Sequence, residues 1–443
     1  MAESTEQAEQ SPPPEDLVEE KGEDKSEHLE LQPEQETMRC VVLTGYGGYN
    51  KLEVQKYAKP KPMNGQVVIR VHASGLNFAD IIQRQGIYPS PKKPPFIPGM
   101  ECAGIVEELG EGATELEVGS RVVCLTGQGA WSEYACVPAK SCFVIPDSMS
   151  FEDAAAIPIT YLTAYFMLFL CASLGQRKSV LIHMAAGGVG IAAAQLCKTV
   201  EGVTTFGTAS AFKHETILAN GIDHAIDYRT VDYVQEVKKI CPEGVDIVLD
   251  SLGGADTKKG YNLLRPMGII VCFGNASAVT ETKSVFTSAK NWFQGATFNP
   301  LQLLRDSKTV CGFHLAQMHS HPELLKSGME HIFSKFQGPS DLEQMLGGDL
   351  RKFSIMQTGV GKAMQRMHQR KNVGKIIISP MKEPTLEPTP QPPAEPAPTE
   401  EEDGKTEDKE GEEKTEDKEG EEKTGGEKEE PKAEEEKKEE AAA

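Results

Sequence analysis

The feature that most restricts the fold of this chain is a short run of residues between positions 179 and 197. An apolar pentapeptide, SVLIH, is followed by the turn sequence MAAGGVG and then by the alanine-rich segment IAAAQLC. This order indicates a buried strand, a tight glycine turn and a helix, which together form the first half of a βαβ unit. The turn reads A-x-G-x-x-G, with Ala185 in place of the first glycine of a dinucleotide-binding fingerprint.

The two remaining fingerprint glycines have separate physical roles. Gly187 would let the backbone approach a pyrophosphate, and Gly190 would let the helix pack closely on the strand. The start of the helix presents unpaired N–H groups and the positive end of its dipole to the anion. The sequence therefore predicts a dinucleotide-binding site at this turn.

The surrounding chain alternates strands and helices. After residue 151, apolar strand segments at 180–183, 203–206, 245–250 and 267–273 are separated by helices beginning near Gly188, Lys213 and Asp256. Such alternation predicts a Rossmann-type, doubly wound parallel sheet of the α/β class. Before residue 150, short β-rich runs at 38–43, 66–76, 102–106 and 121–125 are punctuated by glycine and proline, which predicts a mainly β domain.

The end of the 203–206 strand indicates which dinucleotide is bound. NAD sites place Asp or Glu about 20 residues after the glycine turn to hold the ribose 2′-hydroxyl. Here the segment from Gly207 to Lys213 contains no carboxylate, whereas Ser210 can donate a hydrogen bond and Lys213 adds positive charge. We therefore expect NADPH to be preferred over NADH. The alternative for Lys213 is an ordinary solvated helix residue.

The acidic residues are concentrated at the two ends of the chain. The 443 residues carry a formal net charge of −21, but 13 acidic and 2 basic residues lie in 1–37, and 25 acidic and 10 basic residues lie in 381–443. The part between them therefore carries +5. The tails are predicted to be disordered, because they offer too little apolar surface to offset the entropy of ordering. They would act as solvating spacers or, alternatively, as cation-binding or docking tails, and the overall charge argues against nucleic acid as a partner.

Two long stretches lack charged residues. Residues 154–175 and 179–197 contain no Asp, Glu, Lys or Arg, so each is a candidate membrane span by hydropathy. The second also fits a buried parallel strand, a turn and a packed helix, and we favour a soluble core for both. The ten scattered cysteines form no C-x-x-C pair, and no secretory leader is visible, which favours reduced thiols in the cytoplasm.

Residues 98–106, PGMECAGIV, resemble the G-H-E-x-x-G signature of the medium-chain dehydrogenase/reductase superfamily. Met100 replaces the zinc-ligand histidine of that signature, and Asn77 stands where zinc-dependent members carry a cysteine, so no metal is expected. The segment 75–88, GLNFADIIQRQGIY, is similar to the quinone oxidoreductase branch, and further segments resemble its vesicle amine transport proteins. The resemblance covers about 38–334 and 362–380.

The resemblance implies a domain plan and a set of site residues. A GroES-like domain would span 38–150, the dinucleotide-binding domain 151–310, and a C-terminal return to the first domain 311–380, with a helix at 362–370 and a strand at 374–378. Tyr88 and Asn77 would serve as catalytic groups beside the nicotinamide. The implied cofactor-binding residues are Asn77, Thr163, Gly187, Gly188, Val189, Gly190, Ser210, Lys213, Tyr228, Phe273, Gly274 and Asn372. The alternatives are that Tyr88 only packs a turn, that Phe273 is a core residue, and that Tyr228 is a surface loop residue.

Two functions follow as hypotheses. In the first, the chain is a zinc-independent reductase that transfers a hydride from NADPH to a quinone or an α,β-unsaturated ketone, with Tyr88 and Asn77 stabilising the developing oxyanion. In the second, it binds the cofactor with little turnover and associates with anionic phospholipid through its basic body. The resemblance implies a homodimer, located in the cytoplasm or peripherally on vesicles or the mitochondrial outer membrane.

Overall fold

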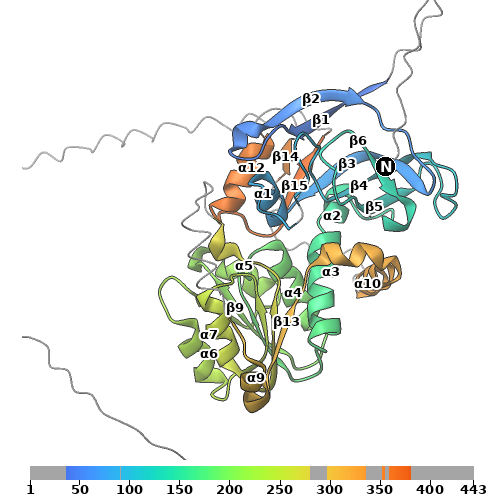
Figure 1. Ribbon diagram of the computed structural model, residues 1–443. Helices are drawn as coiled ribbons and strands as arrows, with labels where there is room; N and C mark the ends of the chain where they lie inside the picture. Colours follow the sequence, from blue (N-terminus) through green and yellow to red (C-terminus); the bar gives the residue numbers. More distant parts are fainter. Residues whose placement is uncertain (1–35, 90, 280–296, 336–351, 355–358, 381–443) are drawn as a thin grey trace, which may run out of the picture. The chain divides into compact units, whose positions relative to one another are not determined.

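The structure, a computed structural model, describes residues 36–89, 91–279, 297–335, 352–354 and 359–380. Within these residues the predicted combination of a Rossmann-type parallel sheet and a mainly β N-terminal part is confirmed (Figure 1). The predicted acidic tails lie outside the described residues, apart from Glu36 and Thr37.

A six-stranded parallel sheet has the order β10-β9-β8-β11-β12-β13. Its strands are β8 (Ser179–Ile182), β9 (Thr204–Ala209), β10 (His224–Asp227), β11 (Val245–Asp250), β12 (Leu264–Cys272) and β13 (Thr309–Gly312). Its helices are α3 (Pro158–Tyr165), α4 (Gly188–Lys198), α5 (His214–Ala219), α6 (Tyr233–Ile240), α7 (Ala255–Leu263), α9 (Pro300–Asp306) and α10 (Pro322–Lys335). Helix α2 (Phe151–Ala155) precedes them and packs on the second sheet, described below.

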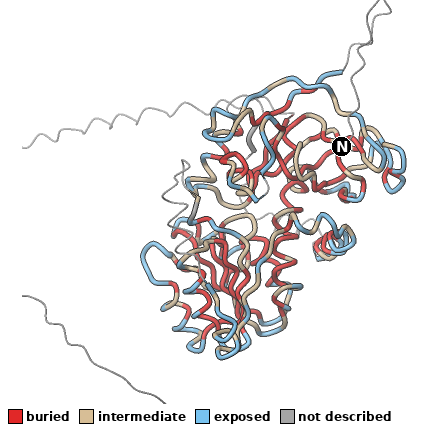
Figure 2. The backbone as a smooth tube through the Cα atoms, in the orientation of Figure 1, coloured by how far each residue is buried: buried red, intermediate tan, exposed pale blue. Residues whose placement is uncertain are grey.

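Successive side chains of a strand point to opposite faces of the sheet, so each strand contributes to two core layers. On β8, Val180 and Ile182 pack with residues of α3, α4 and α10, whereas Leu181 packs with residues of α6 and α7. Figure 1 shows α3 and α4 on one side of the sheet and α6 and α7 on the other. The sheet is therefore buried on both faces, which explains its nearly continuous apolar strands (Figure 2).

The second sheet has the order β14-β15-β3-β4-β5-β7, and β6 pairs with β3. Its strands are β3 (Gln66–Leu76), β4 (Glu101–Leu109), β5 (Arg121–Leu125), β6 (Tyr134–Pro138), β7 (Cys142–Val144), β14 (Lys352–Ser354) and β15 (Ile376–Ser379). A hairpin of β1 (Thr37–Leu43) and β2 (Leu52–Ala58) adds a two-stranded sheet. Helix α1 (Phe78–Arg84) follows β3, and α12 (Gly359–His368) precedes β15.

The C-terminal strand returns to the first sheet, as predicted. β15 pairs antiparallel with β3, with Ile376 opposite Leu76. The predicted boundary at 310 was misplaced, however. β13 continues the parallel sheet to Gly312, and α10 packs on α3 in the largest core cluster, because both bury apolar residues there. Most of the segment in which the resemblance fails, 335–361, lies outside the described residues.

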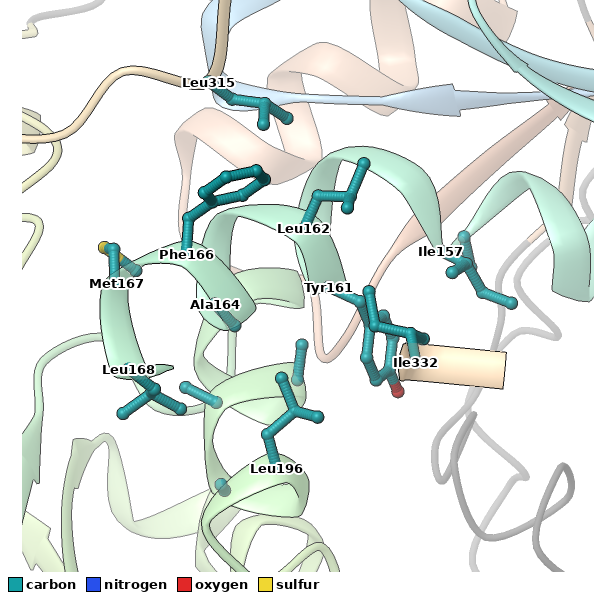
Figure 3. Packing of buried hydrophobic residues seen from close by; sticks show 14 of the residues in the cluster. Ile157, Tyr161, Leu162, Ala164, Phe166, Met167, Leu168, Leu196, Leu315 and Ile332 are labelled. Atoms are coloured by element: carbon teal, nitrogen blue, oxygen red, sulfur yellow. The ribbon is translucent and has the colours of Figure 1, made fainter. Parts of the chain in front are cut away.

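Both charge-free stretches are core elements, as favoured. Residues 154–175 form the end of α2, then α3 and the π-helical turn η3 (Phe166–Cys171), and 179–197 form β8 and α4. Figure 3 shows Tyr161, Leu162 and Phe166 of this region packed near Leu196 of α4, Ile332 of α10 and Leu315. Among the described residues, no helix is long and apolar enough to cross a membrane.

Candidate active site

The glycine turn joins β8 to α4, and its packing explains its glycines. A Cβ at Gly190 would lie 2.6 Å from the backbone of Ala185, so only glycine lets α4 approach the turn this closely. Gly187 precedes the first residue of α4, Gly188, with extended backbone. Gly187 also forms a bridge with Gly374, whose N–H donates to the Ala186 carbonyl at 2.9 Å. The C-terminal segment therefore lies along the predicted pyrophosphate turn.

A polar cluster with two arginines lies at the end of β9. Burial alone would raise the pKa of the Tyr228 hydroxyl, but hydrogen bonds with Arg229, Ser210 and Arg370 lower its pKa below the ordinary value. Ser210 is buried and Tyr228 is 39% exposed. The cluster therefore brings two hydroxyls and two guanidinium groups together at the edge of the protein. The structure joins the predicted residues Ser210 and Tyr228 and adds Arg229 and Arg370 to them.

Lys213, predicted to add positive charge beside a 2′-phosphate, forms two hydrogen bonds to the C-terminal segment. Its ammonium group donates to the carbonyls of Arg370 at 2.8 Å and Asn372 at 2.7 Å. Burial lowers the pKa of Lys213, and the positive charges of Arg229, Arg366 and Arg370 lower it further. It is not an ordinary solvated helix residue, because it is buried and holds the C-terminal segment against the end of β9.

A buried ion pair lies beside Asn77. The Lys375 ammonium is 2.5 Å from Glu101 Oε1 and donates to Asn77 Oδ1, while Asn77 Nδ2 donates to Glu101 Oε1 at 2.8 Å. The side chains of Lys375 and Glu101 are 5% and 0% exposed. Glu101 Oε2 accepts from the Ile159 N–H at 2.9 Å. The network therefore connects the residue before β15 with β4 and the start of α3, and it fixes the orientation of the Asn77 amide.

Asp80 completes this buried polar group. Asn77 is the N-cap of α1, and its N–H donates to Asp80 Oδ2 at 2.8 Å in a capping box. Burial raises the pKa of Asp80 to about 7, and the Glu101 charge adds to this, while the Asn77 N–H and Lys375 oppose it. Near neutral pH, Asp80 is therefore poised between its charged and neutral forms.

Tyr88 forms a hydrogen bond that the sequence did not reveal. Its hydroxyl oxygen is 2.9 Å from Nε2 of His314, which lies directly before the 3-10 helix η6 (Leu315–Ser320). Burial raises the pKa of Tyr88, and the Asp80 charge raises it further, whereas burial lowers the pKa of His314. Tyr88 thus does more than pack a turn.

The other predicted positions lie on α3, after β12 and in the segment before β15. Thr163 is buried on α3. Phe273 and Gly274 follow β12, where a Cβ on Gly274 would lie 2.8 Å from the Ser251 carbonyl oxygen. Phe273 is half-buried against the largest core cluster, so its alternative role in the core remains open. Asn372 Nδ2 donates to the Gly374 carbonyl, which shapes the C-terminal segment beside the turn.

Six residues of these clusters were missed as site residues from sequence: Asp80, Glu101, Arg229, His314, Arg370 and Lys375. Two of them could have been found from a pattern in the neighbouring sequence. Asp80 stands three residues after Asn77, which is the spacing of a capping box. Lys375 is a lone charge directly before the apolar strand β15. His314 has no such signal, because only the fold brings it to Tyr88.

Asn77 and Glu101, which the resemblance sets beside a zinc site of other family members, are engaged with a cation of the chain itself. Asn77 and Glu101 already share the Lys375 ammonium, which supplies positive charge at that point. Within the part of the chain that the structure describes, no group of three or more His, Cys, Asp or Glu side chains is arranged to hold a metal.

Family models match both parts of the chain. The model described as Alcohol dehydrogenase GroES-like domain matches residues 63–147, and the model described as Zinc-binding dehydrogenase matches residues 188–330. The first covers most strands of the antiparallel sheet, and the second covers α4 to α10.

Three known proteins illustrate the similarity. The synaptic vesicle membrane protein VAT-1 homolog of Danio rerio is 48% identical over 360 residues, which cover 80% of this chain and 73% of that protein. The crystal structure of the human VAT-1 homolog-like protein matches at 40% identity with a TM-score of 0.67, over 79% of this chain and 99% of that one. Escherichia coli quinone oxidoreductase complexed with NADPH matches at 27% identity with a TM-score of 0.67, over 77% and 100%.

Proposed function

The chain belongs to the VAT-1 homolog family of the medium-chain dehydrogenase/reductase superfamily, and from that premise we propose that it is an NADPH-dependent reductase of quinones or α,β-unsaturated ketones. The coarser assignment, an oxidoreductase, rests on its quinone-oxidoreductase-like relatives. When bound, NADPH supplies the hydride for this chemistry.

The observation that carries the proposal is the cluster of Ser210, Tyr228, Arg229 and Arg370 at the end of β9. A 2′-phosphate is a dianion with several acceptor oxygens, and guanidinium groups bind such anions through charge-assisted hydrogen bonds. The hydroxyls of Ser210 and Tyr228 can donate to the same anion. Lys213 would position Arg370 by holding its carbonyl. A carboxylate, which would favour NADH, is absent from the segment 207–213.

We assign the remaining cofactor contacts to the elements around the turn. Gly187, Gly188, Val189 and Gly190 would hold the pyrophosphate at the N-terminus of α4. The other contacts are those of Thr163 with the carboxamide, of Phe273 and Gly274 with the nicotinamide, and of Asn372 as the closing residue from the C-terminal segment.

On the substrate side, Tyr88 and Asn77 would face the reducible carbonyl. One N–H of Asn77 is donated to Glu101, so its second N–H is the one available to a substrate oxygen. Lys375 sits against the Asn77 amide oxygen and polarises that amide. Stabilisation of a developing oxyanion by fixed donors needs no metal ion.

The test is a titration of the full chain with NADPH and with NADH, followed by cofactor fluorescence. NADPH should bind more tightly, and Arg370→Gln should weaken NADPH binding about 10-fold or more without changing NADH binding, because one charged hydrogen bond contributes about 1.5–3 kcal/mol. Arg305→Gln, a change at a 78% exposed arginine, is the matched control. Equal affinities for the two cofactors would contradict the 2′-phosphate assignment, and no binding of either would contradict the enzyme.

A second candidate function is favoured by the surface of α9. Leu301 and Leu304 are 73% and 77% exposed, and Met267, 83% exposed, donates its N–H to the carbonyl of Ser307 at the end of α9. Arg305 directly follows Leu304 in the sequence. Exposed apolar side chains beside a cation suit peripheral binding to an anionic phospholipid surface on vesicles or the mitochondrial outer membrane. Co-sedimentation with phosphatidylserine liposomes should fall on Leu301→Ser/Leu304→Ser and with rising salt, and unchanged co-sedimentation would remove this candidate.

We also propose a homodimer. Among the described residues, β13 is the outermost strand of the parallel sheet and pairs only with β12, so its other edge presents unpaired backbone groups. Sedimentation equilibrium should give twice the chain mass of 48.3 kDa. A monomer at micromolar concentration would refute this assembly.

A further inference from the structure

The pair of Tyr88 and His314 is the strongest feature that the proposed function leaves unexplained. The two residues are 226 positions apart in the sequence, yet Tyr88 Oη and His314 Nε2 lie 2.9 Å apart. Their rings are tilted by 59° with centroids 5.6 Å apart. Both side chains are half-buried, so each has one side toward solvent or a ligand and one toward the protein.

Reduction of a quinone or an enone by hydride also requires a proton. If Tyr88 alone donated this proton, the tyrosine would be left as a phenolate in a half-buried site, where burial disfavours the charged form. A second group must then return a proton to Tyr88 before the next turnover. His314 is the titratable side chain in hydrogen-bond contact with Tyr88.

We propose that His314 supplies the proton for reduction by passing it through Tyr88. This inference rests on the proposed function. The substrate accepts a hydride, which is one proton with two electrons, from the cofactor, and the cofactor is thereby oxidised. The substrate oxygen takes the proton of the Tyr88 hydroxyl, Tyr88 takes the proton from His314 Nε2, and Nδ1 takes a proton from water. Proton exchange of the neutral ring with water then moves the hydrogen from Nδ1 back to Nε2 before the next turnover. The net uptake is one hydride and one solvent proton.

The environment favours a relay through a neutral imidazole. Burial lowers the pKa of His314, which favours the neutral ring at neutral pH. The neutral ring relays a proton by giving up the hydrogen on Nε2 and taking one at Nδ1. In the starting tautomer, Nε2–H donates to the Tyr88 oxygen and leaves the Tyr88 hydrogen free for the substrate. The charged group acting on Tyr88 is Asp80 of α1, which in turn interacts with Lys375, directly before β15, and with Glu101 of β4.

The alternative is that His314 only holds Tyr88 in position. Non-additivity shows that the two residues act together: in either case the double variant should lose no more than the worse single variant. Chemical rescue separates a proton relay from a positioning contact. A small base added to the buffer can replace the lost imidazole in a relay, but it cannot restore a phenol or reposition one.

The experiment measures NADPH oxidation with a quinone panel for Tyr88→Phe, His314→Ala and the double variant. We expect kcat to fall about 10²-fold in each single variant, the lower end of the range for general acid–base catalysis, with no further loss in the double variant. Imidazole in the buffer should restore part of the activity of His314→Ala and none of that of Tyr88→Phe. His321→Ala, at a 53% exposed histidine in the same region, is the control.

A second readout does not depend on turnover. Nitrogen-15 NMR of the histidine rings in the cofactor-free chain should show His314 neutral at pH 7 with its hydrogen on Nε2. The Nε2 resonance should shift in Tyr88→Phe and not in His321→Ala. A hydrogen on Nδ1 would overturn the relay, because Nε2 would then accept from Tyr88 and have no proton to give.

The outcomes separate the two proposals. A wild-type chain that binds NADPH but reduces no quinone or enone overturns the proposed function, and the relay with it, before any substitution is made. Normal wild-type turnover with unchanged kcat in His314→Ala overturns the relay alone. A loss in His314→Ala that adds to that of Tyr88→Phe and resists imidazole also overturns it and leaves only a packing role.

Discussion

The buried pair of Lys375 and Glu101 makes a strong prediction about stability. Lys375→Met keeps most of the apolar stem but removes the ammonium that lies 2.5 Å from Glu101 Oε1. The carboxylate then remains in a site where its side chain is 0% exposed, with hydrogen bonds from only Asn77 and Ile159 among the recorded contacts of the described residues. The substitution should therefore leave a buried charge without compensation.

The size of the effect follows from the burial of both partners. At an effective dielectric constant of about 20, two unit charges at this separation attract by about 7 kcal/mol, but desolvation offsets much of that attraction. Removing one partner of a buried pair costs about 3–5 kcal/mol. We expect the free energy of unfolding of Lys375→Met to fall by that amount. Lys375→Met/Glu101→Gln should recover most of the loss, because no charge then remains.

Urea unfolding followed by circular dichroism measures this effect. The control is Lys239→Met, which breaks an ion pair between Lys239 and Glu236 whose side chains are 67% and 32% exposed, and which should cost less than about 1 kcal/mol. If Lys375→Met lowers the free energy of unfolding no more than this control does, the buried pair does not stabilise the fold as we predict. A double variant less stable than Lys375→Met would refute the reasoning in the same way.

Two further predictions concern Asp80 and the glycine turn. Folding raises the pKa of Asp80 from 3.8 to about 7, so the unfolded chain releases this proton at lower pH than the folded chain does. The free energy of unfolding should therefore fall by about 4 kcal/mol as the pH rises from 4 to 7 and stay level above that. Urea titrations at each pH measure this change, and Asp80→Asn should abolish it. Gly190→Ala should lower stability by about 1–3 kcal/mol and weaken NADPH binding, since its Cβ would meet the Ala185 backbone at 2.6 Å. Gly175→Ala, with open space around its Cβ, is the control, and equal effects of the two changes on thermal unfolding and cofactor titration would contradict the packing role.

Local patterns predicted many, but not all, of the elements of the fold. The glycine turn predicted the junction of β8 and α4, and alternation predicted the parallel sheet, because burial on both faces makes each strand apolar and each crossover helix amphipathic. β5 and β11 were predicted with their observed bounds. Short strands such as β10, whose four residues His-Ala-Ile-Asp have no clear period, were missed.

The site depends both on local sequence and on the tertiary structure. By itself, the sequence determined that a glycine turn joins an apolar strand to a helix and that the segment 207–213 lacks a carboxylate, since each of these is a local property of adjacent residues. Only the tertiary structure decided that Lys375 reaches Asn77 across 298 positions and that His314 reaches Tyr88. It also decided that the Lys213 ammonium donates hydrogen bonds to two backbone carbonyls. Contacts over such separations are set by how the sheets and their connections pack, and no periodicity along the chain encodes them.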